Sequence, residues 1–269
     1  MRIYLAGLLG ISILLTGCPR NEVTGRKQLS LVPESQLRQM AVQEYKGFLT
    51  QNKVVTSGGN KDAEMVKRVG NRISKAITDY YTQQGKAKVM EGYAWEFNLV
   101  QDNQVNAWCM PGGKVVVYTG LLASAQNEAA LAVVMGHEIS HAVAGHGGER
   151  MSQGLLAQGL GTLGDLATSN NPKVNKLFDN VFGIGAQAGY LLPNSRKQEL
   201  EADHYGLLFA AMAGYNPREA IPFWQRMAKA GGAKPPEFLA THPSDENRIK
   251  ALETHMDEAI SYYQKAGGK

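Results

Sequence analysis

The chain has 269 residues, of which 43% are hydrophobic, and its 28 lysines and arginines stand against 24 aspartates and glutamates. This composition supplies a hydrophobic core and excludes both a disordered tail protein and a protein with many membrane spans. The formal charge of +4 comes without a long basic run, so nucleic acid is not expected as a partner.

The first segment, residues 1–17, is an apolar stretch behind a single arginine, Arg2. The stretch is too short to span a bilayer and has the order of a secretory signal. It ends in Leu15-Thr16-Gly17-Cys18, which resembles the lipobox before whose cysteine bacterial lipoproteins are cleaved. We therefore expect residues 1–17 to be removed and Cys18 to carry a lipid anchor, with an ordinary signal peptide as the alternative. In the sorting rule of such lipoproteins, Pro19 in place of an aspartate favours the outer membrane.

Residues 18–32 show no sustained periodicity and are predicted to be a linker or arm between the anchor and a single domain over residues 33–269. Two amphipathic patterns, roughly Pro33 to Thr50 and Lys61 to Gln84, predict packing helices. Cys109 is the only other cysteine, so a disulfide within the mature chain is not expected.

Three short runs with β-strand character follow the helices: Ala94 to Val100, Val105 to Met110 and Lys114 to Tyr118. The turn signal Pro111-Gly112-Gly113 separates the last two, which predicts a hairpin in a small antiparallel sheet. Helical patterns dominate the rest of the chain. They are weakly specified between Met151 and Leu192, and we expect this glycine-rich region to be at least partly mobile.

The segment from Asn127 to His146 contains the run His137-Glu138-Ile139-Ser140-His141 inside an otherwise apolar helical pattern. Residues four apart lie on one face of a helix, so His137 and His141 can offer two ring nitrogens to one metal ion. Glu138 lies beside them and can reach a water on that metal without being a ligand. Two imidazoles and a carboxylate are costly to bury without a partner, which favours a zinc site over a chance match.

A catalytic zinc takes a third protein ligand and leaves one position open for water. His146 would face away from His141 if the helix continued, so we interpret it as a residue at the helix end or behind the ligands. The better candidate is Glu199, which shares a helix face with Asp203, whereas Glu201 points roughly opposite and is the runner-up. Asp203 would accept a hydrogen bond from the free N–H of a ligand histidine. The pattern thus predicts one zinc ion per chain, held by two histidines and one glutamate.

Four blocks stand in order along the chain: VNAWCMPGGKVVVYTGLL (Val105 to Leu122), HEISH, ELEAD and THPSDENR (Thr241 to Arg248). Together they resemble the zinc metallopeptidase family of the CAAX prenyl protease and HtpX type, over about Pro33 to Ala251. The resemblance implies endopeptidase activity and a mainly helical α+β, gluzincin-like fold with a small antiparallel sheet beside the zinc-binding helix. It also implies that the strand around Asn106 binds an extended substrate. It gives His242 a role, either in contacting the transition state or in capping the metal in a latent form.

The chain lacks the spanning helices and the tetratricopeptide array of other branches, so it is most similar to the compact periplasmic lipoproteins of that family. We expect a lipid-anchored zinc endopeptidase that hydrolyses misfolded or misassembled envelope proteins by Glu138-assisted attack of zinc-bound water. The Met151 to Leu192 region would cover its substrate groove. Two alternatives stay open: a non-catalytic zinc-containing chaperone or assembly factor, and a hydrolase of cell-wall or lipid material. The sequence specifies neither a cleavage preference nor an oligomeric state.

Overall fold

The computed structural model describes residues 19–159, 171–182, 195–230, 238–239, 242 and 246–268. The predicted signal segment and Cys18 lie outside the described residues, as do parts of the region between Met151 and Leu192. Among the helices that are described, none combines the length and the apolar character needed to cross a bilayer.

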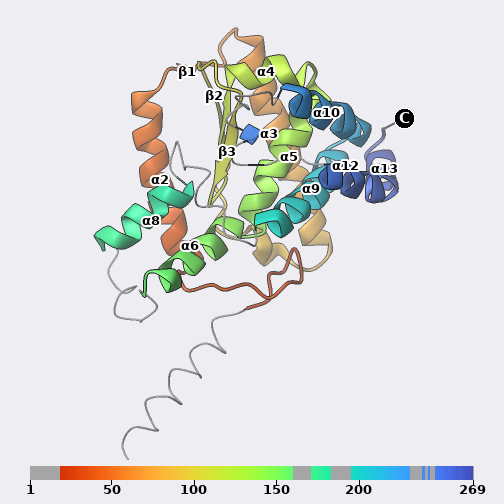
Figure 1. Ribbon diagram of the computed structural model, residues 1–269. Helices are drawn as coiled ribbons and strands as arrows, with labels where there is room; N and C mark the ends of the chain where they lie inside the picture. Colours follow the sequence, from red (N-terminus) through yellow and green to blue (C-terminus); the bar gives the residue numbers. More distant parts are fainter. Residues whose placement is uncertain are drawn as a thin grey trace, which may run out of the picture.

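The described chain is mainly helical, with a small sheet between two groups of helices (Figure 1). The elements follow in the order α2 (Glu34–Gln51), β1 (Val54–Val55), α3 (Lys61–Gln83), η1 (Ala87–Met90), β2 (Glu96–Val100), β3 (Ala107–Met110), β4 (Lys114–Tyr118), α4 (Thr119–Ala125), α5 (Glu128–Val143), α6 (His146–Ala157), α8 (Pro172–Phe182), α9 (Ser195–Met212), η3 (Pro217–Glu219), α10 (Ala220–Ala230), α12 (Glu246–Thr254) and α13 (Met256–Lys265). The predicted mainly helical α+β class is confirmed, and both helices expected before the sheet are present as α2 and α3.

The sheet has the strand order β1-β2-β4-β3, and the prediction of a wholly antiparallel sheet is wrong. Strands β3 and β4 form the expected antiparallel hairpin, but β2 and β4 run parallel, with Val100 beside Tyr118. Strand β4 lies inside the sheet, with a neighbour on each side, because it is buried on both faces. All five of its residues, Lys114 to Tyr118, are buried, and a strand that is covered on both faces takes a central place. Strand β1, which was not predicted, pairs antiparallel with β2.

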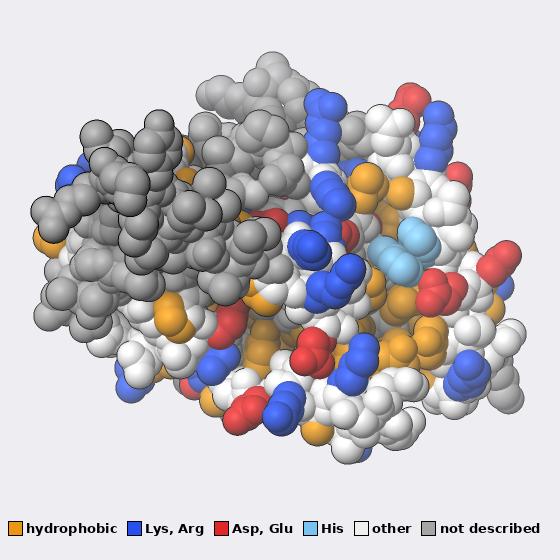
Figure 2. Space-filling view, turned by 90° about the horizontal axis from the view of Figure 1, so that it is seen from below, with side chains coloured by type: hydrophobic (Ala, Val, Ile, Leu, Met, Phe, Trp, Pro, Cys, Tyr) orange, Lys and Arg blue, Asp and Glu red, His pale blue; other side chains and the backbone are white. Residues whose placement is uncertain are grey.

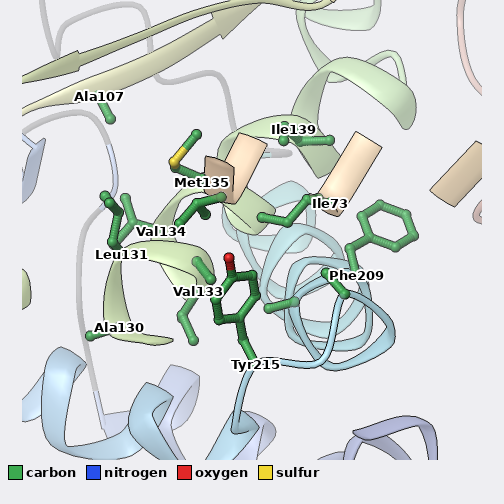
Figure 3. Packing of buried hydrophobic residues seen from close by; sticks show 14 of the residues in the cluster. Ile73, Ala107, Ala130, Leu131, Val133, Val134, Met135, Ile139, Phe209 and Tyr215 are labelled. Atoms are coloured by element: carbon green, nitrogen blue, oxygen red, sulfur yellow. The ribbon is translucent and has the colours of Figure 1, made fainter. Parts of the chain in front are cut away.

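The two faces of the sheet belong to two hydrophobic clusters. Val115 and Val117 face a large cluster with α3, α5 and α9, whereas Val116 and Tyr118 face a smaller one with α2, α6 and α8. This alternation is the period of two expected for a strand. Figure 3 shows side chains of α5 in the large cluster together with Ile73 of α3 and Phe209 of α9.

Helices α5 and α9 approach each other unusually closely, because a glycine lies on each side of the contact. A Cβ atom on Gly136 would lie 2.5 Å from the carbonyl oxygen of Gly206. A Cβ atom on Gly206 would lie 2.6 Å from the backbone nitrogen of His137. Only residues without a side chain permit this approach. It brings the helix that carries His137 against the helix that carries Glu199.

The N-terminal arm, residues 19–32, packs against the domain instead of leading away from it. The side-chain amides of Asn21 and Gln28 both donate to the carbonyl oxygen of Ala144, at 3.0 and 2.8 Å. An isolated bridge between Arg20 and Lys27 closes the arm into a hairpin-like turn. The residues predicted to be a linker or arm therefore contact the end of α5.

The described parts of the region predicted to be mobile are helices. Residues 151–157 belong to α6 and residues 172–182 form α8, and Met151, Leu177 and Phe178 are buried in the smaller cluster. These helices are thus part of the packed structure, and the mobility of the region stays a prediction. Residues 160–170 and 183–192, on which the rest of that prediction falls, lie outside the described residues.

Candidate metal centre

Helix α5 presents its two histidines inside the protein. The side chain of Asn127 caps its first turn by accepting a hydrogen bond from the backbone N–H of Ala130. The helix is apolar on nearly all sides, as expected for one that is surrounded by other elements. His137 and His141 are consequently buried, with 1% and 6% of their surface exposed.

Four side chains converge at this point: His137, His141, Glu199 and His242. The Nε2 atoms of His137 and His141 are 3.1 Å apart, and the Glu199 carboxylate lies 3.4 Å from the first and 3.3 Å from the second. His242 Nδ1 lies 3.3 Å from His137 Nε2 and 3.0 Å from Glu199 Oε2. The structure therefore brings the three predicted ligands together and adds His242 to them.

The arrangement fits a zinc ion. Atoms bound at about 2.0–2.1 Å to a tetrahedral zinc lie about 3.3 Å from one another, which matches the spacing of these nitrogen and oxygen atoms. The converging ring nitrogens and carboxylate are electron-pair donors in a buried space, and a cation is the partner that such a set requires.

Asp203 lies behind His137, as expected. Its Oδ1 atom is 3.0 Å from His137 Nδ1, on the side of the ring away from the ligand atoms. Arg248 donates two hydrogen bonds of 2.7 Å to the same carboxylate. Burial raises the pKa of Asp203, but the charge and hydrogen bonds of Arg248 outweigh burial and keep the pKa below its usual value. Asp203 is thus an anion that orients the His137 ring.

The two helix histidines have opposite pKa shifts in the metal-free protein. For His137, burial lowers the pKa, but hydrogen bonds to Asp203 and Glu199 outweigh burial and raise it to about 9. For His141, burial prevails, and the pKa lies well below its usual value. Metal binding must therefore displace a proton from His137.

Glu138 lies beside the ligands and is 4% exposed. Its Oε1 atom is buried and has no hydrogen-bond partner among the residues that the structure describes. The nearest basic group is His242, whose Nε2 atom is 3.4 Å away. Burial raises the pKa of the Glu138 carboxyl group, which increases its affinity for a proton. A buried carboxylate with a free oxygen beside a metal site is suited to act as a general base.

Asn106 does not join the ligand group. Its side-chain oxygen accepts a hydrogen bond from its neighbour Ala107, and its carbonyl accepts one from Tyr118. The preceding carbonyl, of Val105, accepts a hydrogen bond of 3.2 Å from the backbone N–H of Phe238. The backbone at which a substrate strand was expected to pair is thus in contact with the segment that leads to His242.

The runner-up ligand, Glu201, is not in the ligand group. It contacts His146, whose Nε2 atom lies 3.0 Å from Glu201 Oε2, and His146 Nδ1 lies 2.9 Å from His141 Nδ1. His146 reaches this place because α5 ends before it and Gly145 adopts a left-handed φ of 66°. The helix does not continue, so His146 faces His141 from behind instead of pointing away.

A second group of possible ligands lies at the surface: His204, His255 and Glu258. Figure 2 shows histidine side chains exposed beside acidic ones on one face of the molecule. The rings of His204 and His255 stack at 3.6 Å with 17° between their planes, and His204 Nε2 contacts Glu258 Oε2 at 3.0 Å. Stacked rings meet by their faces, so their nitrogens do not point at a common centre.

Two arginines at this site were not predicted to have a functional role. Arg248, besides its bonds to Asp203, has its Nη1 atom 3.3 Å from Glu199 Oε2 and 3.2 Å from the His242 carbonyl. Arg26 lies in the predicted linker and pairs with Glu149 and Glu201. The position of Arg248 in the same block as His242 was a usable signal. Arg26 carried none, because its partners lie far away in the sequence.

Comparison with known proteins adds a family and several relatives. Residues 65–256 match the family described as peptidase family M48. The chain is 39% identical over 178 residues to the mitochondrial metalloendopeptidase OMA1 of Arabidopsis thaliana, covering 65% of this chain and 35% of the relative. It is 31% identical over 273 residues to human OMA1, covering 94% and 49%. It is 33% identical over 161 residues to the beta-barrel assembly-enhancing protease of Yersinia pestis, covering 58% and 33%. The chain thus spans about a third to a half of the length of these relatives.

Proposed function

The chain belongs to peptidase family M48, and from this premise we propose that it is a zinc-dependent metalloendopeptidase. One observation carries the proposal: the buried Glu138 carboxylate, with one oxygen that has no hydrogen-bond partner among the described residues, lies beside the converging ligand atoms of His137, His141 and Glu199. A zinc site that only supports the fold has no need of a base next to it. The names of the relatives, metalloendopeptidase and protease, support the same activity.

The chain's own residues divide the work. His137, His141 and Glu199 would hold the zinc ion, and Asp203 would keep the His137 ring in its ligand orientation. Zinc, when bound, acts as a Lewis acid that polarises a carbonyl and makes water nucleophilic near neutral pH. Glu138 takes one proton from the attacking water as the new C–O bond forms. It then delivers that proton to the leaving nitrogen as the C–N bond breaks, which regenerates the carboxylate.

His242 fills the fourth corner of the ligand group in this structure. Its Nδ1 atom lies with the other ligand atoms, and its Nε2 atom lies 3.4 Å from Glu138 Oε1. A catalytic zinc keeps one position open for water, and His242 would fill it. Of its two predicted roles, this placement corresponds to the cap of a latent form. His242 must then withdraw before a substrate enters.

Replacing His242 by alanine separates the two roles. If His242 caps the site, His242→Ala loaded with zinc should cleave casein faster than the wild type. The increase in rate should be roughly the reciprocal of the fraction of wild-type molecules in which His242 has left the site. A loss of kcat at saturating zinc, by contrast, would show that His242 contacts the transition state.

The main experiment compares wild type, Glu138→Gln and Glu199→Ala for bound zinc and for casein cleavage. Glu138→Gln should keep about one zinc per chain and lose cleavage by ~10²–10⁴-fold, the usual contribution of a general base. Glu199→Ala should lose zinc and cleavage together. Cleavage that survives in Glu138→Gln would reject the mechanism. Wild-type protein that binds zinc but cleaves no protein would favour the chaperone or the hydrolase of other envelope material.

The location and the substrates are also part of the proposal. We place the protein at the periplasmic face of the envelope, anchored through Cys18, with the outer membrane favoured and with misfolded or misassembled envelope proteins as substrates. The lipobox-like run before Cys18 supports the anchor, and the name of the Yersinia pestis relative, a beta-barrel assembly-enhancing protease, supports the substrate class. Palmitate labelling and membrane fractionation of wild type and Cys18→Ser test the anchor, since a soluble, unlabelled wild type would contradict it.

A further inference from the structure

Arg26 is the most strongly bonded residue of the N-terminal arm. Its Nη1 and Nη2 atoms donate hydrogen bonds of 2.6 Å to the two oxygens of Glu149 on α6. Its Nε atom donates one of 2.7 Å to Glu201 on α9. In Figure 1 the arm runs beneath α6 and α9, which these contacts join. Paired guanidinium–carboxylate contacts of this kind fix geometry as well as charge.

The contacts continue from Glu201 to a ligand of the metal site. Glu201 Oε2 lies 3.0 Å from His146 Nε2, and His146 Nδ1 lies 2.9 Å from His141 Nδ1. His146 is fully buried, at 0% exposure. The arm is thus joined to the back of the His141 ring by contacts that are each 3.0 Å or shorter.

The hydrogen bonds of this series can converge on Glu201, whose carboxylate accepts from both sides. When His141 uses Nε2 as its ligand atom, its Nδ1 carries the proton and donates to His146 Nδ1. His146 then carries its own proton on Nε2 and donates to Glu201 Oε2. Arg26 donates to both oxygens of the same carboxylate, at 2.7 Å to Oε1 and 3.1 Å to Oε2. Arg26 thus fixes the Glu201 carboxylate, whose position sets the tautomer and ring orientation of His146 and, through His146, of the ligand His141.

Attachment of the arm does not by itself require Arg26. The amides of Asn21 and Gln28 already hold the arm to Ala144 at the end of α5. A largely buried ion pair contributes little net stability after the cost of removing both charges from water. The ion pairs of Arg26 instead fix the position of the Glu201 carboxylate, one oxygen of which contacts His146.

We propose that Arg26 is a positioning residue for the zinc ligand His141, acting through Glu201 and His146, so that docking of the N-terminal arm sets the zinc affinity. The inference rests on the zinc site of the proposed function. The arm lies directly after the cysteine expected to carry the lipid.

Zinc dissociation constants, measured by chelator competition on the mature chain, test the proposal. His146→Ala should weaken zinc binding by ~10–100-fold, as partners behind a ligand do, and Glu201→Gln and Arg26→Ala by roughly three- to tenfold because they act at longer range. Glu149→Gln is the matched control, since Glu149 accepts from Arg26 but does not lead to His146; its zinc affinity should stay within about twofold of the wild type.

A double variant distinguishes an effect of Arg26 that passes through Glu201 and His146 from a general loss of structure. If Arg26 acts through His146, zinc binding in Arg26→Ala/His146→Ala should be no weaker than in His146→Ala alone. The visible spectrum of the cobalt-substituted protein should shift in Arg26→Ala and not in Glu149→Gln, because it reports the geometry of the ligands. Should Arg26→Ala fail to fold, Arg26→Lys, which keeps the charge but loses the forked geometry, is measured in its place.

Three results would overturn the inference. The first is a wild-type zinc affinity in Arg26→Ala, or in Arg26→Lys where that variant is used instead. The second is a loss of zinc affinity in the double variant that equals the product of the two single losses, and the third is an equal loss of zinc affinity in Glu149→Gln and Glu201→Gln. In each case a wild type that binds one zinc leaves the proposed function intact. A wild type that binds no zinc would instead remove the proposed function itself.

Discussion

Helix α9 takes part in two groups of histidines and carboxylates that share a composition and little else. Glu199 belongs to the buried group, whose ring nitrogens and carboxylate oxygens converge. His204, five positions on, belongs to the surface group, whose imidazole rings stack on each other. In the buried group, Asp203 and His146 contact the ligand rings from behind. The comparison indicates that the types of residue alone do not define a metal site. The ligand rings must also be held in place by groups behind them, as Asp203 and His146 do in the buried group.

The largest expected effect comes from removing one histidine of each group. His141→Ala should weaken zinc binding by at least ~10³-fold, because one of the protein ligands is lost. His204→Ala should leave about one zinc bound per chain, since its group does not converge. Elemental analysis after dialysis against a weak chelator measures both. Zinc lost from His204→Ala and kept by His141→Ala would reverse the assignment of the two groups.

The pH dependence of zinc binding sharpens the comparison. The pKa of His137 is raised to about 9 from the ordinary value of 6.5, so its proton stabilises the metal-free fold below pH 6.5. That stabilisation is lost as the pH rises through about 9. Zinc must displace this proton, and its affinity should therefore fall by about tenfold per pH unit below 9. A titration series from pH 7 to 9 measures the slope, which His204→Ala should leave unchanged. A flat profile would mean that His137 holds no proton in the metal-free protein.

A smaller effect is expected from the close approach of α5 and α9. Gly206→Ala places a Cβ atom against the backbone of His137, which should cost about 1–3 kcal/mol of the free energy of unfolding. It should also weaken zinc binding, because α9 carries Glu199. Gly47→Ala on α2 is the control: its Cβ meets open space, and it should raise the free energy of unfolding by about 0.5–1 kcal/mol. Urea denaturation of the metal-free proteins measures both, and equal stabilities would show that the helices can separate without cost.

The parts of the site that could be predicted are those formed by residues close to one another in the sequence. His137 and His141 follow from a spacing of four on one helix, and the choice of Glu199 over Glu201 follows from the same period on another. The geometry agrees with that choice, since Glu199 is in the ligand group and Glu201 is not. The place of His146 could not be foreseen, because it depends on the left-handed turn at Gly145.

Contacts between distant segments explain the other gaps. Arg26 lies 175 positions from Glu201, and no local period connects them. The runs of apolar residues in the strands predicted that a sheet exists and which two strands form the hairpin. They did not predict that β4 lies between β2 and β3, because register and neighbour choice depend on what covers each face.

The hydrogen bond between Phe238 and Val105 bears on how a substrate would reach the proposed site. The carbonyl of Phe238 accepts the backbone N–H of His242, so the strand edge at Val105 and the fourth corner of the site are held by one short stretch of chain. In the metallopeptidase proposed above, a peptide that paired with the Val105 carbonyl would compete with Phe238 and so would disturb the stretch that holds His242. Cleavage would then depend on whether a substrate is long enough to reach that strand edge.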